Sequence, residues 1–233
     1  DVYDNGEIGN ALGTFKEIIR ILLLHVGGTF GMVRSEKGLT TAPGQLKDKI
    51  QQSEFLNMNW NNEEAPMIFS NVGCINDRAV HYDFEELPVL KDSTEARAKD
   101  VLEIVEKIRE RYHEYDGFVV IHGTDTMAYV GSAVSCMIQN LQKPIVFTGS
   151  MIPISHEKSD AAENLNRALN WLLRNHKSRG VYLSFHKQFS RIEYTYKHNA
   201  SQIDAFRSIP APESTSGRES PDGSVIFLSK IAD

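Results

Sequence analysis

Apolar and polar residues follow one another along this chain in blocks of two different periods. Short, mostly apolar runs of strand length are typical of buried strands, and they lie at 18–26, 118–121, 145–148 and 181–185, with a further candidate at 67–72. Apolar residues also recur at helical spacing, within 101–108, 133–141 and 165–172. Because strands and helices take turns, the pattern predicts a doubly wound, mainly parallel α/β sheet with helices on both faces.

Two segments interrupt this alternation. Residues 38–44 are rich in Gly, Thr and Pro, which predicts a mobile loop before a short helix around 45–52. Prolines, glycines and serines gather between 208 and 224 and indicate a linker, after which residues 225–231 begin one more strand. We therefore expect one domain over residues 1–207 and a linker with the start of a second domain over residues 208–233.

Composition narrows the class of protein. The chain has 233 residues, is 41% apolar and carries a net charge of −6, as expected of a soluble cytoplasmic enzyme domain and not of a nucleic-acid-binding protein. Its longest apolar stretch is far shorter than the ~20 residues that span a bilayer, so no membrane association is predicted. Cys74 and Cys136 are widely separated, without the spacing of metal ligands, and are interpreted as free thiols.

Two polar turns carry most of the functional information. Gly27-Gly28-Thr29 follows the first strand, and His122-Gly123-Thr124-Asp125-Thr126 follows the run at 118–121. Ligands of open parallel sheets bind beyond the carboxyl ends of the strands, so both turns are expected at one crevice. The sequence contains no serine-hydrolase elbow, phosphate-binding loop or zinc-protease motif, which leaves hydroxyl chemistry without a cofactor or a metal ion.

The two turns resemble motifs of the bacterial-type L-asparaginases, as do Asp92-Ser93, Thr148-Gly149-Ser150 and Ser159-Asp160 in the same order and spacing. The resemblance spans about residues 18–206, and the Asp-Ser pair is similar to that of the cytosolic type I branch, which includes animal members. It implies the fold of the asparaginase N-terminal domain. It also implies a cytoplasmic, homo-oligomeric amidohydrolase that converts L-asparagine to L-aspartate and ammonia.

The resemblance assigns roles to particular residues. Thr29 is the implied nucleophile, which forms an acyl-enzyme and releases ammonia. Thr124, Asp125 and Lys197 form the implied Thr-Lys-Asp triad, in which a desolvated lysine acts as a base. Ser93 and Asp125 are implied to hold the α-carboxylate and α-ammonium groups of the substrate. The full set implied to bind substrate is Asp92, Ser93, Thr94, Gly123, Thr124, Asp125 and Ser150.

Each assignment has a purely structural alternative. Thr29, Thr124 and Ser93 are residue types that cap helices, and Asp125 complements the dipole of a helix that begins near Thr126. Lys197 is of a type that usually lies solvated at the surface. Two other functions also stay open: a non-catalytic module that binds asparagine or aspartate, and the glutamine amidase subunit of a tRNA amidotransferase. His25, His122 and His156 are expected to pack or to form supporting hydrogen bonds.

Three features depart from the family pattern. Leu39 stands in the loop where many members carry a tyrosine that helps to activate the nucleophile, and Ala161 replaces a glycine after Ser159-Asp160. The family also has a smaller C-terminal domain, and that of a neighbouring subunit helps to close the active site. The chain ends at Asp233, before such a domain. We therefore expect this chain alone to bind L-aspartate weakly and to hydrolyse asparagine poorly.

Overall fold

A central eight-stranded sheet organises the computed structural model, which describes residues 17–36, 38–52, 67–69, 72–75, 78–210 and 224–228. The strand order is β11-β10-β9-β7-β1-β6-β5-β4. In chain order these strands are β1 (Glu17–Gly27), β4 (Met67–Phe69), β5 (Val72–Ile75), β6 (Arg78–Lys91), β7 (Gly117–Ile121), β9 (Pro144–Thr148), β10 (Gly180–Phe185) and β11 (Gln188–Arg191).

The middle of the sheet is parallel and its two margins are antiparallel. Strands β6, β1, β7, β9 and β10 run in the same direction, whereas β11 at one margin and β5 and β4 at the other run against their neighbours. The inner strands β7 and β9 are buried along their whole length, so their apolar runs have no polar interruption. The predicted mainly parallel α/β fold is confirmed.

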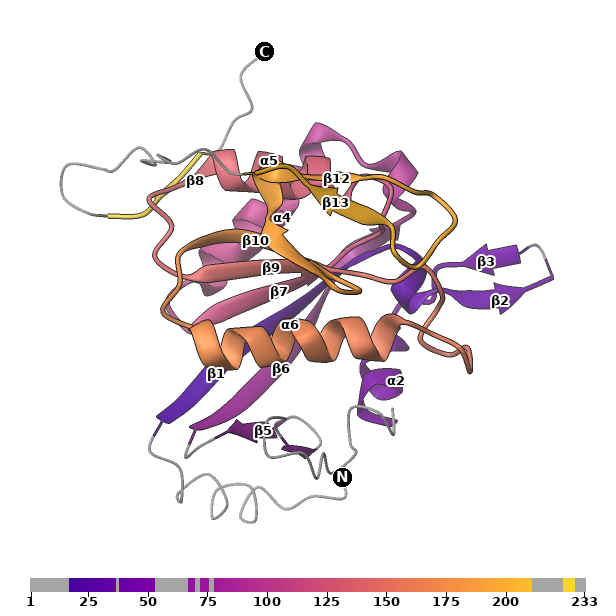
Figure 1. Ribbon diagram of the computed structural model, residues 1–233, viewed down its shortest axis with the longest axis horizontal. Helices are drawn as coiled ribbons and strands as arrows, with labels where there is room; N and C mark the ends of the chain where they lie inside the picture. The colour runs from indigo at the N-terminus through magenta and orange to yellow at the C-terminus, as the bar shows by residue number, and fades with distance from the viewer. Residues whose placement is uncertain are drawn as a thin grey trace.

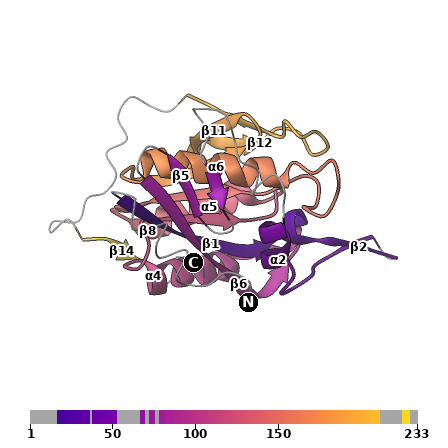
Figure 2. The same cartoon turned by 90° about the horizontal axis from the view of Figure 1, so that it is seen from below.

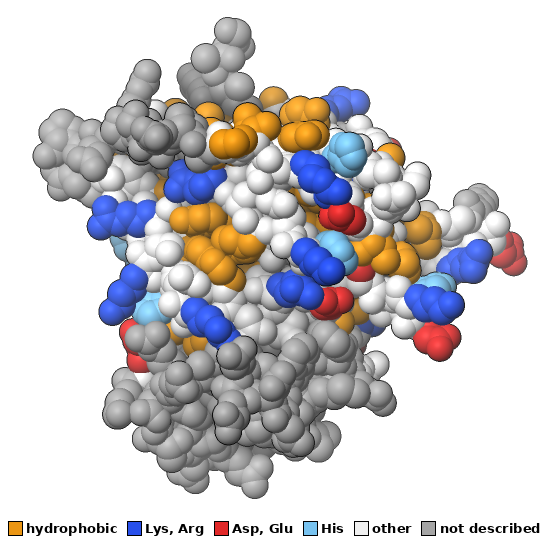
Figure 3. Space-filling model, viewed as in Figure 1, with side chains coloured by type: hydrophobic (Ala, Val, Ile, Leu, Met, Phe, Trp, Pro, Cys, Tyr) orange, Lys and Arg blue, Asp and Glu red, His pale blue; other side chains and the backbone are white. Residues whose placement is uncertain are grey.

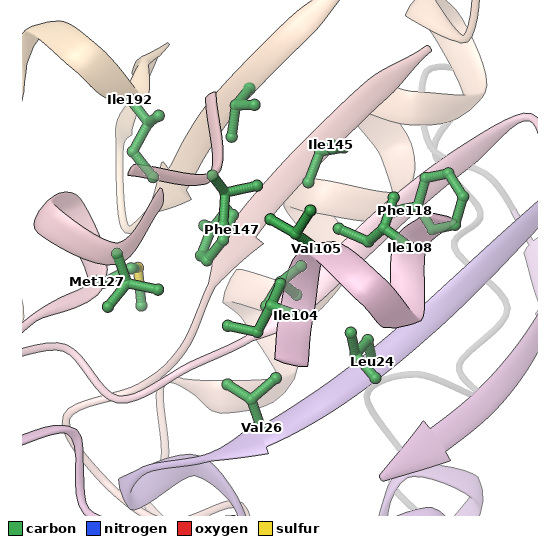
Figure 4. Packing of buried hydrophobic residues seen from close by; sticks show 14 of the residues in the cluster. Leu24, Val26, Ile104, Val105, Ile108, Phe118, Met127, Ile145, Phe147 and Ile192 are labelled. Carbon is green, nitrogen blue, oxygen red and sulfur yellow. The ribbon is translucent and has the colours of Figure 1, made fainter. Parts of the chain in front are cut away.

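Helices cover both faces of the sheet, as Figures 1 and 2 show for α6 (Ala161–Asn175) on one face and α4 (Ala98–Arg111) on the other. Alternate residues of β1 divide between the two cores. Leu24 packs in the cluster that contains α4 and α5 (Met127–Met137), and Figure 4 shows it beside Ile104 and Ile108. Leu23 belongs to the cluster on the opposite face, with α6 and α2 (Leu46–Gln52).

Three smaller strand pairs lie outside the main sheet. They are the hairpin of β2 (Val33–Ser35) with β3 (Gly38–Thr40), the pair of β8 (Ile138–Gln139) with β14 (Ile226–Phe227), and the pair of β12 (Thr195–Lys197) with β13 (Phe206–Ser208). The β2–β3 hairpin projects from the body of the molecule in both views (Figures 1 and 2).

Several boundaries differ from the sequence prediction. The expected loop at 38–44 begins with strand β3, because residues 38–40 pair with β2. The strand expected at 67–72 is divided between β4 and β5, which pair antiparallel with each other. The helix expected over 133–141 ends at Met137, since Ile138 pairs with Phe227 of β14. Most of the predicted linker, residues 211–223, lies outside the described residues, whereas a strand does begin at Ile226.

Strand β6 is a 14-residue element that the apolar pattern did not predict. It lies beside β1 and carries the charged residues Asp83, Glu85 and Glu86, which break the apolar run expected of an inner strand. These three side chains are partly exposed because beyond residue 81 no second described strand pairs with β6.

The surface over α6 combines aromatic and basic side chains. Trp171 of α6 stacks on Phe189 of β11, with ring centroids 4.3 Å apart, and lies 4.6 Å from the ring of Tyr182. Figure 3 shows apolar side chains gathered on this face with Lys and Arg side chains around them. Among the described helices, none is long and apolar enough to cross a membrane. Cys136 is free and exposed, and the side chain of Cys74 lies outside the described part.

Candidate active site

The two polar turns meet at the carboxyl ends of β1 and β7, which are neighbouring parallel strands. Gly28 has φ 85°, a conformation that strains any residue with a side chain. A Cβ atom built on Gly28 would lie 2.2 Å from the Cα atom of Gly123, and one built on Gly123 would lie 3.0 Å from the Cα atom of Gly28. The backbones of the two turns are therefore in direct contact, and these glycines form the floor between them.

Thr29 begins the short 3₁₀ turn Thr29–Gly31 on this floor and is half-buried. Gly28 occupies the capping position of the turn, so the Thr29 hydroxyl is not a cap. The Thr29 carbonyl accepts a hydrogen bond from the Met32 N–H at 3.1 Å, whereas its hydroxyl has no hydrogen-bond partner within the described ranges. The helix-capping interpretation of Thr29 is therefore wrong.

Thr124, Asp125 and Lys197 come together as one hydrogen-bonded group. The Lys197 ammonium donates to Thr124 Oγ1 at 2.8 Å and to Asp125 Oδ1 at 2.7 Å. The Lys197 side chain is only 12% exposed, so the surface-lysine alternative does not hold. Thr124 is buried and Asp125 is 48% exposed, which leaves the carboxylate open on one side.

A glycine that sequence reasoning missed helps to place Lys197. The 3₁₀ turn Ile192–Tyr194 precedes β12 and packs on α5, where a Cβ atom at Gly131 would lie 2.0 Å from Ile192 Cδ1. The Ser132 hydroxyl donates to the Ile192 carbonyl at 3.4 Å and adds a polar contact at the same place. A close approach of helix and turn therefore sets the start of β12, whose last residue is Lys197.

Ser93 lies against the second turn. It is buried, its Oγ accepts from the Asp125 N–H at 3.3 Å, and its carbonyl accepts from the Thr126 hydroxyl at 2.8 Å. Asp92 and Thr94 are exposed, and the Asp92 carboxylate accepts from the Thr94 N–H and hydroxyl, both at 2.9 Å. Asp92, not Ser93, therefore caps a short 3₁₀ turn, Ser93–Glu95, and helix α4 begins separately at Ala98.

Ser150 belongs to a third loop beside the two turns. Its hydroxyl is buried and donates to the Ile152 carbonyl at 2.7 Å, so it stabilises the loop. The next residue, Met151, accepts a weak hydrogen bond from the Thr124 hydroxyl at 3.6 Å and donates its N–H to the Asp160 carboxylate at 3.0 Å. Ala161, where the family has glycine, is fully buried in the core below, so the extra methyl group is accommodated.

Two of the three candidate histidines flank the turns without touching the reactive hydroxyls. His122 is buried, its Nδ1 lies 2.8 Å from the Gly123 carbonyl, and burial lowers the pKa of its imidazole. His25 is paired with Glu86 at 2.8 Å. His156 is exposed and accepts from the Lys158 N–H at 3.1 Å. Within the described ranges, no group of three or more His, Cys, Asp or Glu side chains is arranged to hold a metal ion.

A free hydroxyl on one turn, with a hydroxyl and a carboxylate on the other turn that are both bonded to the Lys197 ammonium of β12, are the elements of nucleophilic acyl transfer. The family described as "Asparaginase, N-terminal" matches residues 20–221. The chain is 37% identical over 192 residues to L-asparaginase 1 of Escherichia coli and 39% identical over 195 residues to an L-asparaginase of Thermococcus kodakarensis. These matches cover 82% and 84% of this chain.

The fold agrees with these matches. The crystal structure of L-asparaginase I from Vibrio cholerae has a TM-score of 0.69 at 30% identity, over 90% of this chain and 60% of that one. The chain therefore belongs to the asparaginase family. The matched region covers about half the length of these two relatives: 51% of the Escherichia coli enzyme and 52% of the Thermococcus kodakarensis enzyme.

Proposed function

We propose that this protein hydrolyses the side-chain amide of L-asparagine to L-aspartate and ammonia, with Thr29 as the nucleophile. The observation that carries the proposal is that the turn bearing Thr29 touches the turn bearing Thr124 and Asp125, both of which are hydrogen-bonded to Lys197. The Thr29 hydroxyl does not cap its own 3₁₀ turn, so this local structural use of the hydroxyl is absent.

The reaction follows from these groups in two halves. Thr29 Oγ attacks the amide carbon and gives up its proton, and the amide nitrogen takes up one proton; the C–N bond then breaks, so that ammonia leaves and an ester of Thr29 remains. Water then attacks the ester and releases aspartate. The short contact between the Lys197 ammonium and Thr124 Oγ1 gives a route for proton transfer in either half, and Asp125 holds the lysine in place.

Substrate binding is assigned to the same two turns. We assign Asp125, whose carboxylate is half-exposed, to the α-ammonium group, and the buried Ser93 to the α-carboxylate. We assign Asp92, Thr94, Gly123 and Thr124 to the same substrate-binding set. Ser150 contributes indirectly, because its hydroxyl is already bonded to its own loop.

Assembly and domain organisation are further parts of the proposal. We assign residues 1–207 to the catalytic domain and residues 208–233 to a connection toward a smaller C-terminal domain. The length of the Vibrio cholerae enzyme, of which this chain covers 60%, supports that division. A cytoplasmic homo-oligomer is proposed by the same similarity. A non-catalytic binding module is less favoured, since the Lys197 group is intact. The amidase subunit of a tRNA amidotransferase would prefer glutamine.

The deciding experiment replaces the nucleophile. Thr29→Ala is expected to lower ammonia release from asparagine by about a thousandfold or more, because no acyl-enzyme forms. The dissociation constant for L-aspartate, measured by calorimetry, should change by less than about threefold, because binding is assigned to Ser93 and Asp125. Thr29→Ser keeps a hydroxyl and is the matched control, expected to retain measurable turnover. Full activity of Thr29→Ala would move the nucleophile to Thr124.

A further inference from the structure

A buried histidine and a glutamate lie directly behind the turn that carries Thr29. His25 is four residues before Thr29 on β1, and its register partner on β6 is Glu86. Neighbouring positions of parallel strands point to the same face of a sheet, so the two side chains meet. His25 Nδ1 lies 2.8 Å from Glu86 Oε1, and the side chains are 2% and 18% exposed. The pair is thus part of the packed interior and not a surface ion pair.

The histidine ring limits where the Thr29 turn can lie. Gly31 is the last residue of that turn, and a Cβ atom built on it would be 2.7 Å from His25 Cε1 and 2.9 Å from His25 Nε2. The ring therefore rests against the Gly31 backbone, with Leu46 of α2 on the same side. Any rotation of the ring would displace the turn that presents the Thr29 hydroxyl.

Among the residues that the structure describes, Glu86 is the one that fixes the orientation of that ring by a polar interaction. A carboxylate has no proton to give, so His25 Nδ1 is the donor. The other ring nitrogen, Nε2, is buried and has no hydrogen-bond partner among the described residues. The hydrogen bond from His25 has the largest effect on the pKa of Glu86 and lowers it; burial raises the pKa, and the hydrogen bond from the Gly44 N–H lowers it. The net effect holds the pKa of Glu86 below its usual value. Glu86 is therefore ionised at neutral pH.

The second oxygen of Glu86 reaches the segment that follows the β2–β3 hairpin. Glu86 Oε2 accepts from the Gly44 N–H at 2.7 Å. Gly44 has φ 76°, so its backbone turns here in a way that favours glycine. One carboxylate thus links the nucleophile turn, through His25, with the return of the hairpin that carries Leu39. The Leu39 side chain is 51% exposed and offers no hydroxyl to Thr29.

We propose that His25 and Glu86 are positioning residues for the nucleophile, which hold the Thr29 turn and the base of the β2–β3 hairpin in one fixed arrangement. The proposal rests on the proposed asparaginase function. His25 acts through Gly31 and touches neither the substrate nor the reacting atoms. Such positioning matters because displacement of a nucleophile by about 1 Å costs up to about a hundredfold in rate.

The test is Glu86→Gln, which keeps the size of the side chain. A glutamine has one carbonyl oxygen, so it accepts from His25 or from the Gly44 N–H, while its NH₂ group faces the other donor. We expect kcat for asparagine to fall by about tenfold to a hundredfold, with KM changed by less than about threefold. Hydrogen exchange of the Gly44 amide should accelerate by about tenfold or more.

A second variant separates the two contacts of the pair. His25→Asn keeps an N–H near the position of Nδ1 but removes the ring from Gly31. We expect it to lower kcat as Glu86→Gln does, while the Gly44 amide stays protected. The matched control is Glu106→Gln, which removes a carboxylate hydrogen-bonded to Arg109 on the exposed face of α4 and should change neither kcat nor Gly44 exchange.

Unchanged kcat in Glu86→Gln overturns the positioning role, even where Gly44 exchange accelerates. Failure of the underlying function looks different: the parent protein itself then releases no ammonia from asparagine. In that case unchanged Gly44 exchange in Glu86→Gln is the result that overturns the link between the carboxylate and the hairpin. If the Gly44 amide exchanges faster in Glu86→Gln but stays protected in His25→Asn, the result supports the link between the carboxylate and the hairpin.

Discussion

Two glycines and one histidine set the floor of the site at the scale of single residues. Gly28 and Gly123 allow backbone contact between the turns, and neither position has room for a Cβ atom. His122 lies just before Gly123 and is buried, with the Asp100 carboxylate as the charge that acts on it. Because burial outweighs that attraction, the pKa of His122 is lowered and the imidazole is neutral at pH 7.

The lowered pKa of His122 predicts how stability responds to acid. In the unfolded chain the pKa of a histidine is about 6.5. Below that pH the unfolded chain binds a proton that the folded protein does not. The contribution of His122 to the free energy of unfolding is therefore complete above about pH 6.5, and it is lost as the pH falls from there through the pKa of the folded state. The free energy of unfolding then changes by at most about 1.4 kcal/mol per pH unit.

Denaturant titrations between pH 7.5 and about pH 5 measure this slope for the free energy of unfolding. His122→Gln, which cannot titrate, should flatten it. His156→Gln is the matched control, because His156 is exposed, and it should leave the slope unchanged. Equal slopes for His122→Gln and the parent would contradict the prediction.

At the scale of elements, the contact of α5 with the 3₁₀ turn Ile192–Tyr194 decides where β12 begins. The contact depends on Gly131, which lies buried on α5 directly below Ile192. Thr195 reinforces it, because its hydroxyl donates to the Arg191 carbonyl at 2.9 Å. A short strand pair with few hydrogen bonds of its own thereby holds Lys197 over the second turn.

Gly131→Ala tests this contact. The new methyl group would overlap Ile192 Cδ1, and overpacking of this kind lowers the free energy of unfolding by about 1–3 kcal/mol. The higher helix propensity of alanine offsets about 1 kcal/mol of that loss. Ile192→Val removes that Cδ1 atom and costs about 0.5–1.5 kcal/mol alone. We expect the double variant to be more stable than the sum of the two single changes by at least about 0.5 kcal/mol. Simple additivity in urea unfolding would refute the overlap.

At the scale of the whole molecule, the site is a meeting place of distant segments on one edge of the sheet. Thr29, Ser93, Thr124 and Lys197 come from four separate segments of the chain: two 3₁₀ turns, the loop after β7, and β12. The site is open on one side, since Thr29 is only half-buried and the Asp125 side chain is 48% exposed. Transition-state stabilisation depends on fixed groups shielded from water, so we expect an open site of this kind to catalyse weakly.

We therefore expect the 233-residue chain to bind L-aspartate weakly and to turn over asparagine slowly. We expect kcat/KM to be lower by a factor of at least about 30, which corresponds to about 2 kcal/mol, the lower end of what one interaction with a charged group in a closed site contributes. Steady-state assays and calorimetry on this chain and on a longer form of the protein measure the difference. Equal kcat/KM in the two would show that nothing beyond this chain is needed to complete the site.

The sequence alone determined the features that arise from short-range chemistry. Apolar runs such as 118–121 and the helical spacing at 165–172 reflect burial on a sheet and on one helix face, and both elements were located correctly. The turns at Gly27–Thr29 and His122–Thr126 were recognisable because glycine, threonine and aspartate after a strand have few other uses. The topological rule for parallel sheets then placed both turns at one edge.

Only the tertiary structure decided the contacts between residues far apart in the chain. Lys197 lies 72 residues from Asp125; the family resemblance singled it out, but no local pattern reports which of the chain's lysines becomes buried beside that carboxylate. The sequence pattern did not predict strand β6, because its charged residues are typical of a loop and only its pairing with β1 makes the segment a strand. The link from His25 through Glu86 to Gly44 depends on the register of that pairing. Register and helix packing are properties of the assembled sheet, where burial and hydrogen bonding select one partner among many.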